Sequence, residues 1–424
     1  MRIFLKNIGK IDNAEVDIDG ITVIAGENDT GKSTVGRALF AVVKSFYHID
    51  EKIQEERAQG IESVITAMGK QFLRKMSFTL SFHKKDLVRS ILGKADSLKD
   101  DVNLIKDVFY QLLFLQDKEI SCELDSKEAE HYFLKIKQYL NISDHDIVKS
   151  ILGRTLDAVF SHQVSNIYTG EDGKIQMQIK EKRIEIVVSD NIITDITNGL
   201  NLQNQAVYLD GMFAVNDSMN SLFNLNLKSA GENGSYYLYT DIHADSPNVI
   251  EEIVINKKLD KIYSKILSVC SGDLVSNQRL QFGYKRSNSD EILDFANLSA
   301  GLKTFALLKY FLKNDIIQSG GILVLDEPEV HLHPEWQLLF AELIVLIYKE
   351  FDVQVLLNTH SPYFLRAIQV YSAKYGAADQ CRYYLAQSVG DKARVMDTTD
   401  EIDRIYHKLS QPLQQLENER WQDD

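Results

Sequence analysis

The sequence is organised around one short stretch, Gly26-Glu27-Asn28-Asp29-Thr30-Gly31-Lys32-Ser33-Thr34. It matches the pattern G-x-x-x-x-G-K-[ST] of a phosphate-binding loop. The preceding residues 21–25 are apolar and β-branched, which predicts a buried strand, and residues 35–43 are apolar enough for a helix. A strand, a loop and a helix in this order direct several backbone N–H groups and a helix N-terminus at one point. We therefore expect a phosphate group to bind here.

Two side chains of this loop have distinct expected roles. Lys32 would reach the β- and γ-phosphates of a nucleotide, and the Ser33 hydroxyl would be a ligand of Mg²⁺. The other loop residues expected to contact the nucleotide are Gly26, Asn28, Gly31 and Thr34. The alternative is a chance glycine loop beside a lysine, and the motifs further along the chain argue against it.

Two adjacent carboxylates, Asp326 and Glu327, follow the apolar residues 322–325. Such a run predicts a strand buried on both faces. Asp326 is expected near Mg²⁺, directly or through water, and Glu327 is expected to act as the general base toward an attacking water. Because two carboxylates at a buried strand end repel each other unless a cation is present, a purely structural role explains this pair poorly.

Two further motifs are weaker alone. Ser299 and Gly301 lie in Asn-Leu-Ser-Ala-Gly-Leu-Lys (297–303), before a helix predicted at 304–312, so they indicate a second anion-binding helix start. His360 ends an apolar strand, where a neutral imidazole could sense a γ-phosphate or orient water. The histidines of 331–333 have no evident third ligand, which favours a loop that contacts a partner subunit over zinc.

The bulk composition is that of a globular protein with a large core: 424 residues, 44% hydrophobic and 25% charged. The net charge of −14 argues against a surface that coats nucleic acid as a whole. The three cysteines form no CxxC, which indicates a reducing compartment. No signal-peptide pattern and no run of about 18 apolar residues is present, so a cytoplasmic location without membrane contact is expected.

Hydrophobic periodicity divides the chain into segments. Residues 46–163 show mostly helical spacing, and 164–199 show the alternation and turn signals of antiparallel strands, expected at 164–167, 175–179 and 184–188. The predicted fold is α/β: a head made of 1–45 and 200–400, a helical insertion at 46–163 and a small antiparallel β region at 164–199. Residues 400–424 are predicted to form a C-terminal helix or tail.

Together, the four motifs resemble those of ABC-type ATPase heads: Walker A at 26–34, signature at 297–303, Walker B at 322–327 and switch histidine at 360. The run Asp-Glu-Pro-Glu-Val-His-Leu-His-Pro (326–334) is similar to the DEPExxLHP of the RecF/OLD/SMC-like branch. This resemblance covers about 1–45 and 295–370.

The resemblance implies a P-loop NTPase head with a mixed β-sheet that binds ATP and Mg²⁺, with Glu327 and His360 as catalytic residues. It also implies that Ser299 and Gly301 act in trans on the nucleotide held at Lys32 of another copy. A head-to-head dimer, and a higher homo-oligomer, are therefore expected. The glutamine of the family's Q-loop is not assigned, because Gln71 and Gln111 lack a strand context.

The chain further resembles ATPase subunits of prokaryotic anti-phage systems. The PtuA-type ATPases of Septu systems work with an HNH nuclease, and the AriA-type ATPases of PARIS systems hold a Toprim effector; the motifs do not separate the two. No H-N-H or PD-(D/E)xK pattern is present, and the stretch after His360 leaves little room for a Toprim domain. We therefore expect a separate nuclease partner. The alternatives are a RecF-like repair ATPase that contacts DNA directly and a transporter ATPase.

Overall fold

The structure is a computed structural model that describes residues 1–71, 74–113, 125–197, 199–210, 238–239, 249–276 and 282–420. Contacts within the chain define two compact units. The first is made of Met1–Tyr47 and Leu152–Asp424, and the second is His48–Ile151. The domain boundaries expected from the sequence remain predictions, and each unit is described by itself below.

The second unit is helical, as the spacing of its apolar residues predicts. Its helices are α2 (Ile49–Gln71), α3 (Arg74–Gly93), α4 (Ala95–Leu98), α5 (Val102–Leu113), α7 (Lys127–Leu140) and the start of α8 (Asp144–Phe160). In α5, Ile105, Val108 and Phe109 lie on one face and are buried. Phe109 meets Phe133 of α7 edge to face, with ring centroids 5.1 Å apart. These helices therefore share a small core of their own.

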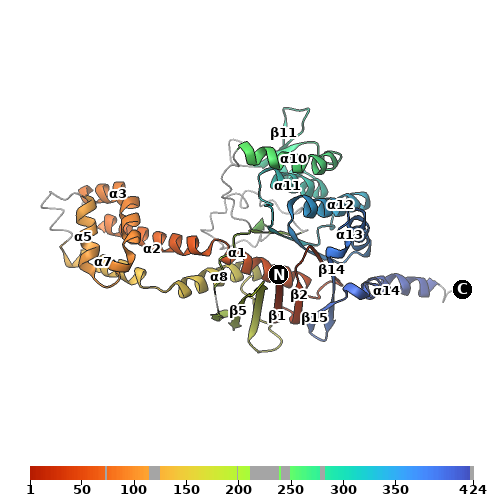
Figure 1. Ribbon diagram of the computed structural model, residues 1–424, viewed down its shortest axis with the longest axis horizontal. Helices are drawn as coiled ribbons and strands as arrows, with labels where there is room; N and C mark the ends of the chain where they lie inside the picture. The colour runs from red at the N-terminus through yellow and green to blue at the C-terminus, as the bar shows by residue number, and fades with distance from the viewer. Residues whose placement is uncertain are drawn as a thin grey trace. The chain divides into compact units, whose positions relative to one another are not determined.

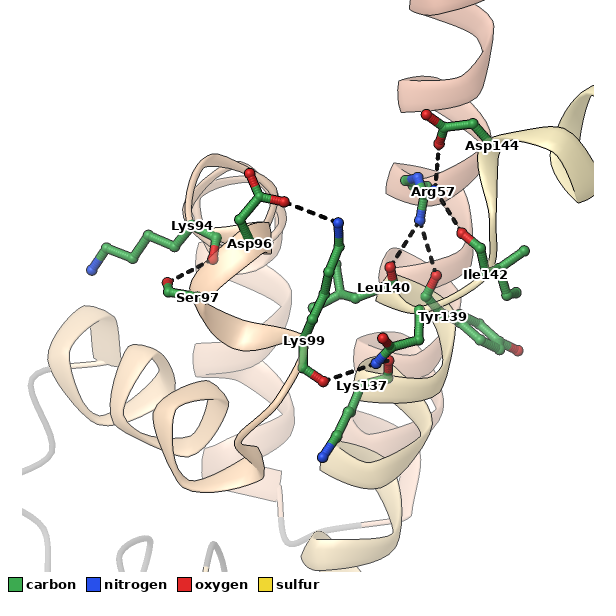
Figure 2. A network of polar contacts seen from close by, with 11 residues as sticks. Arg57, Lys94, Asp96, Ser97, Lys99, Lys137, Tyr139, Leu140, Ile142 and Asp144 are labelled. Carbon is green, nitrogen blue, oxygen red and sulfur yellow. Dashed lines mark hydrogen bonds and ion pairs between the residues drawn. The ribbon is translucent and has the colours of Figure 1, made fainter.

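Arg57 of α2 fixes the end of α7 (Figure 2). Its guanidinium donates to the backbone carbonyls of Tyr139, Leu140 and Ile142, at 3.3, 3.1 and 2.7 Å. It also donates to the Asp144 carboxylate, at 2.6 Å. The last carbonyls of a helix have no partner within the helix. Arg57 satisfies them and holds the turn that leads into α8.

The first unit is built on a mixed sheet, which contains twelve strands among the described residues. Their spatial order is β6-β5-β4-β1-β2-β15-β14-β3-β13-β12-β7-β8. In chain order the strands are β1 (Arg2–Ile8), β2 (Ile11–Asp17), β3 (Ile21–Gly26), β4 (Gly173–Ile179), β5 (Lys182–Ser189), β6 (Ile192–Thr197), β7 (Ala206–Asp210), β8 (Leu238–Tyr239), β12 (Ile322–Asp326), β13 (Gln354–Thr359), β14 (Cys381–Val389) and β15 (Lys392–Asp397).

The central strands β14, β3, β13, β12 and β7 run parallel. Every residue of β3 and of β12 is buried, as expected for strands covered on both faces. Strand β15 pairs with β2, so an N-terminal and a C-terminal strand lie side by side in the sheet (Figure 1). This pairing brings the N-terminal and C-terminal parts of the first unit together.

The strands β4, β5 and β6 differ from the separate β region expected at 164–199. Strand β4 pairs antiparallel with β1, Ile3 lying opposite Met177, so these strands extend the main sheet. On the side of β1 that faces away from β2, the backbone N–H and C=O groups would be unpaired without a further strand. Strand β4 supplies their partners. The strand predicted at 164–167 is wrong. The structure has a single bridge there, between Ile8 and Ser165.

Helices cover both faces of the central strands. The remaining elements are α1 (Lys32–Phe46), α10 (Val249–Ile266), α11 (Ala300–Lys313), α12 (Pro334–Phe351), α13 (Pro362–Lys374) and α14 (Asp403–Arg420), with a small sheet of β9 (Asp273–Ser276), β10 (Phe282–Lys285) and β11 (Ile292–Asp294). Helices α10 to α13 gather together (Figure 1) and share a core with the β12 residues Leu323 and Leu325. Helix α1 packs on the opposite face, where a Cβ on Gly36 would lie 2.9 Å from Val324 Cγ1. None of the described helices is long and apolar enough to cross a membrane.

Glu342 ties three of these helices together. Its buried carboxylate, on α12, accepts from Lys265 Nζ of α10 at 2.8 Å and from Lys374 Nζ of α13 at 2.8 Å. The Tyr375 hydroxyl donates to it at 2.6 Å. Burial alone would raise the pKa of Glu342, but these hydrogen bonds outweigh it and lower the pKa to about 2. The ionised form is therefore the one that stabilises the fold.

We expect Glu342→Gln to destabilise the protein by about 1–3 kcal/mol at pH 7. Because the folded pKa lies below the ordinary value of 4.5, the carboxylate contributes its full stability above pH 4.5. That contribution is lost as the pH falls toward 2, so the difference between variant and parent should shrink. Urea unfolding at neutral and acidic pH measures it.

Glu350→Gln is the matched control, since Glu350 lies on the same helix and, among the described residues, pairs with Lys261 alone, at 3.1 Å. We expect this variant to lose less than about 1 kcal/mol. Equal losses for the two variants at pH 7 would contradict the role assigned to Glu342.

Candidate functional site

The predicted phosphate-binding loop lies between β3 and α1, where the sequence places it. Gly31 precedes the helix with φ +75°, a conformation that glycine adopts without strain. A Cβ there would lie 2.6 Å from Ile11 Cδ1. A Cβ on Gly26 would lie 2.3 Å from the Ala386 carbonyl oxygen of β14. Both glycines are therefore required by the packing of the loop against neighbouring strands.

Lys32 is folded over its own loop. Its side chain is buried, and Nζ donates to the carbonyls of Gly26 at 3.1 Å and Glu27 at 2.7 Å. Nζ also lies 3.6 Å from Glu327 Oε1. Burial lowers the pKa of Lys32, while the nearby carboxylates of Glu327 and Asp326 act in the opposite direction. The ammonium group is thus held at the N-terminus of α1, where a phosphate would contact it together with the backbone N–H groups.

Asp326 ends β12 and is held from both sides. Tyr208 of β7 donates its hydroxyl to Oδ2 at 2.6 Å, and Asn358 of β13 donates Nδ2 to Oδ1 at 3.0 Å. All three side chains are buried. Asp326 lies opposite Asn358 in the pairing of β12 with β13. Sequence reasoning missed both partners. A buried amide inside the apolar run Val-Leu-Leu-Asn was a signal for Asn358, and Tyr208 gave none.

The side chains at this strand end suit a hydrated divalent cation. Oxygen atoms are the ligands that Mg²⁺ prefers, and the carboxylate of Asp326 and the hydroxyl of Ser33 are such groups. The buried Asn358 Oδ1, next to Asp326, has no hydrogen-bond partner among the described residues. An unsatisfied buried acceptor is costly unless water or a ligand completes it. The residues therefore fit the predicted ion.

Glu327 and His360, which belong to separate motifs, lie side by side in the structure. His360 Nδ1 lies 3.2 Å from Glu327 Oε1. This interaction lowers the pKa of Glu327 and raises that of His360. Glu327 has φ +49°, and its N–H donates to the Asn358 carbonyl at 2.9 Å. A non-glycine residue in this region is strained, which is typical of residues held for function. Lys32, Glu327 and His360 thus form one cluster.

Glu329 supports the cluster of Lys32, Glu327 and His360 through the turn that carries His360. Its carboxyl group is buried, and burial raises its pKa. Oε1 accepts from the Thr359 hydroxyl, and Oε2 has no hydrogen-bond partner among the described residues. Thr359 in turn accepts from the backbone N–H of Ser361 at 3.0 Å. The acidic loop after β12 is therefore tied to the turn that carries His360.

The signature residues occupy a different place. Ser299 is exposed, and its side chain makes no capping bond to α11. Gly301 is buried, and a Cβ there would lie 2.9 Å from the Trp336 ring. The contacts described for these two residues do not include Lys32 or Glu327. The structure of one copy therefore joins three of the four motifs, and action of the signature in trans stays a prediction.

His331 and His333 are exposed at the start of α12. His331 has φ +69°. Within the described parts of the chain, no group of three or more His, Cys, Asp or Glu side chains could hold a metal ion in the way zinc sites do. The role of this loop as a contact for a partner remains a prediction.

The comparison with protein families shows to which family the chain belongs. Residues 1–365 match a family described as an AAA ATPase domain. The chain belongs to this family. The protein therefore binds ATP, and the assignment of residues 26–34 as its nucleotide site stays a prediction. Its α/β fold, a P-loop ATPase head on a mixed sheet, confirms the predicted fold class.

Solved structures with a distant likeness include three head domains. An Smc head bound to the C-winged helix domain of ScpA is 12% identical with a TM-score of 0.41, over 93% of this chain and 96% of that chain. An SMC head domain from Thermotoga maritima is 13% identical with a TM-score of 0.34, over 93% and 97%. An Smc head domain with a coiled coil and joint from Pyrococcus yayanosii is 12% identical with a TM-score of 0.38, over 97% and 99%. None of the curated proteins matches the chain.

Proposed function

We propose that the protein is a Mg²⁺-dependent ATP hydrolase that works as an ATP-gated switch in a complex with a nuclease. One observation carries the hydrolase part: the ammonium of Lys32, the carboxylate of Glu327 and the imidazole of His360 meet beside the phosphate-binding loop. Within this site, a cation for phosphate, a base for water and a group that orients the base lie together. That the protein binds ATP follows from its family. That it hydrolyses ATP at this site is our proposal.

The roles follow from the contacts of each side chain. Lys32 would exchange its loop carbonyls for the β- and γ-phosphates. The Glu327 carboxylate, kept ionised by its neighbours, would orient a water for attack on the γ-phosphorus and take its proton as the bond to the β-phosphate oxygen breaks. His360 would hold that carboxylate and contact the γ-phosphate. Mg²⁺, held by Ser33 and Asp326, would neutralise charge on the phosphates.

The switch part of the proposal requires a second copy of the chain. Ser299 is exposed, and its side chain makes no capping bond to its own helix. In the ATPase heads that the motifs resemble, the residues that correspond to Ser299 and Gly301 cap the γ-phosphate held by another copy. ATP would then join two heads, and hydrolysis would release them.

The nuclease is proposed from the resemblance of residues 326–334 to the OLD-like ATPases of anti-phage systems. An HNH nuclease of the Septu kind is the partner proposed first, and a Toprim effector of the PARIS kind is its rival. The exposed His331 and His333 support a docking role for this loop, since neither belongs to a metal cluster among the described residues.

Affinity capture from the native host tests this proposal. Tagged Glu327→Gln protein, which should stay ATP-bound, and tagged Lys32→Ala protein, which should stay empty, are purified in parallel. We expect an HNH nuclease whose amount differs between the two. A Toprim protein would select the PARIS-like alternative.

Equal recovery of the nuclease with both variants would contradict ATP gating. If no nuclease is recovered and the isolated protein binds duplex DNA with an affinity that falls steeply with salt, the chain acts instead as a RecF-like repair ATPase.

A further inference from the structure

The C-terminal helix α14 reaches the phosphate-binding loop. Lys408 Nζ lies 3.1 Å from Glu27 Oε2, the second residue of that loop. Lys408 also donates to Gln411 of its own helix, at 3.3 Å. Helix α14 lies beyond residues 1–365, which match the ATPase family. Its contact with the loop is therefore a feature that neither the family match nor the loop motif assigns.

The position of Lys408 is set by packing. Ile405, three residues earlier and on the same face of the helix, is fully buried. The Tyr406 hydroxyl donates to Gln369 of α13 at 2.5 Å, and Leu409 packs against the main core. The pairing of β14 with β3, with Ala386 opposite Gly26, brings this part of the chain beside the loop. The first turns of α14 thus present Lys408 to Glu27 on a fixed support.

The charge of Glu27 is what gives this contact a function. Its backbone carbonyl accepts from Lys32, so Glu27 lies directly beside the group that binds phosphate. A carboxylate there repels the polyanionic phosphates of ATP unless a cation offsets it. Asp29, the second carboxylate of the loop, contacts Lys10 from the turn after β1. Each acidic residue of the loop thus has a lysine from outside it.

We propose that Lys408 is a nucleotide-site residue that neutralises Glu27, so that the C-terminal helix is part of the ATP-binding site. This inference rests on ATP binding at the loop and requires neither hydrolysis nor dimerisation. The inference predicts the direction in which the affinity for ATP changes. Loss of the Lys408 charge leaves Glu27 uncompensated next to the phosphates, and ATP affinity falls. If the ion pair served instead to lock the empty loop, ATP affinity would rise.

The test measures the affinity of a non-hydrolysable ATP analogue by titration calorimetry. We expect Lys408→Gln to weaken binding about three- to tenfold, which is the range for one partly exposed carboxylate, that of Glu27, left uncompensated near a polyanion. Lys408→Arg keeps the charge and should bind within about twofold of the parent. In a Glu27→Gln background, the same Lys408→Gln change should have an effect of less than about twofold, since its partner charge is gone.

Arg404→Ala is the matched control, because it removes one positive charge from the same helix where that charge pairs with Glu401. We expect parental affinity for this variant. An unchanged or tighter affinity in Lys408→Gln, or an equal loss with and without Glu27, would overturn the proposal. Lys32→Ala separates this result from the site assignment: if it abolishes binding while Lys408→Gln does not alter it, only the inference about α14 fails.

Discussion

Glu327→Gln is expected to lower the rate of ATP hydrolysis by about 10²- to 10⁴-fold while ATP still binds, because a general base contributes that much to the reaction. The amide has nearly the shape of the carboxylate but cannot take a proton from water. The carboxylate lies 3.6 Å from Lys32 Nζ and 3.2 Å from His360 Nδ1, so it is placed between the phosphate site and the histidine. The variant should accumulate in its ATP-bound state.

A single-turnover assay with excess enzyme measures the chemical step directly, and a parallel titration measures ATP affinity. Glu335→Gln is the control, since Glu335 is an exposed carboxylate in the first turn of α12. It should hydrolyse ATP at the parental rate. A loss of less than tenfold in Glu327→Gln would show that another group activates the water.

Lys32→Ala is expected to weaken ATP binding by about 2–5 kcal/mol, the range for truncating one member of a buried charge pair. The ammonium is buried and directed into the loop by two backbone carbonyls. Its removal leaves the phosphates with backbone N–H groups alone and also leaves Glu327 without its nearby cation. Titration calorimetry with ATP measures the loss.

Lys10→Ala serves as the comparison, because Lys10 contacts Asp29, whose side chain is 83% exposed. We expect a loss of less than about 1 kcal/mol there. If Lys32→Ala bound ATP as the parent does, the assignment of residues 26–34 as the nucleotide site would be wrong.

The same variant tests whether Ser299 acts in trans. Lys32→Ala and Ser299→Arg should each lack hydrolysis alone. Mixed together, they can form a heterodimer in which the intact loop of one copy faces the intact signature of the other. Recovery of activity on mixing is therefore expected, and its absence at concentrations where the parent dimerises would contradict the composite site.

The motifs made of neighbouring residues were predictable because local geometry alone determines them. A glycine-rich turn between a buried strand and a helix places Lys32 at the helix start wherever that segment packs. A wholly apolar run likewise places Asp326 and Glu327 at the end of a buried strand. His360 was predicted in the same way, and the structure brings it to Glu327.

Contacts made across the sheet were not predictable from one sequence. The register of β7, β12 and β13 is set by pairing between strands distant in the chain, and this pairing alone places Tyr208 and Asn358 on Asp326. The strand expected at 164–167 failed for a related reason. Apolar, β-branched residues allow a strand, but a strand also needs a free edge, and β4 occupies the edge of β1.

The sequence by itself predicted a phosphate-binding loop and the side chains that would face a nucleotide, because these residues are contiguous within each motif. The tertiary structure decided which motifs form one cluster and which distant residues support them. Glu27 and Lys408 lie far apart in the sequence. They meet because β14 pairs with β3 and because α14, which comes after β14 in the chain, packs on the main core. No local pattern encodes that meeting, since it depends on strand order.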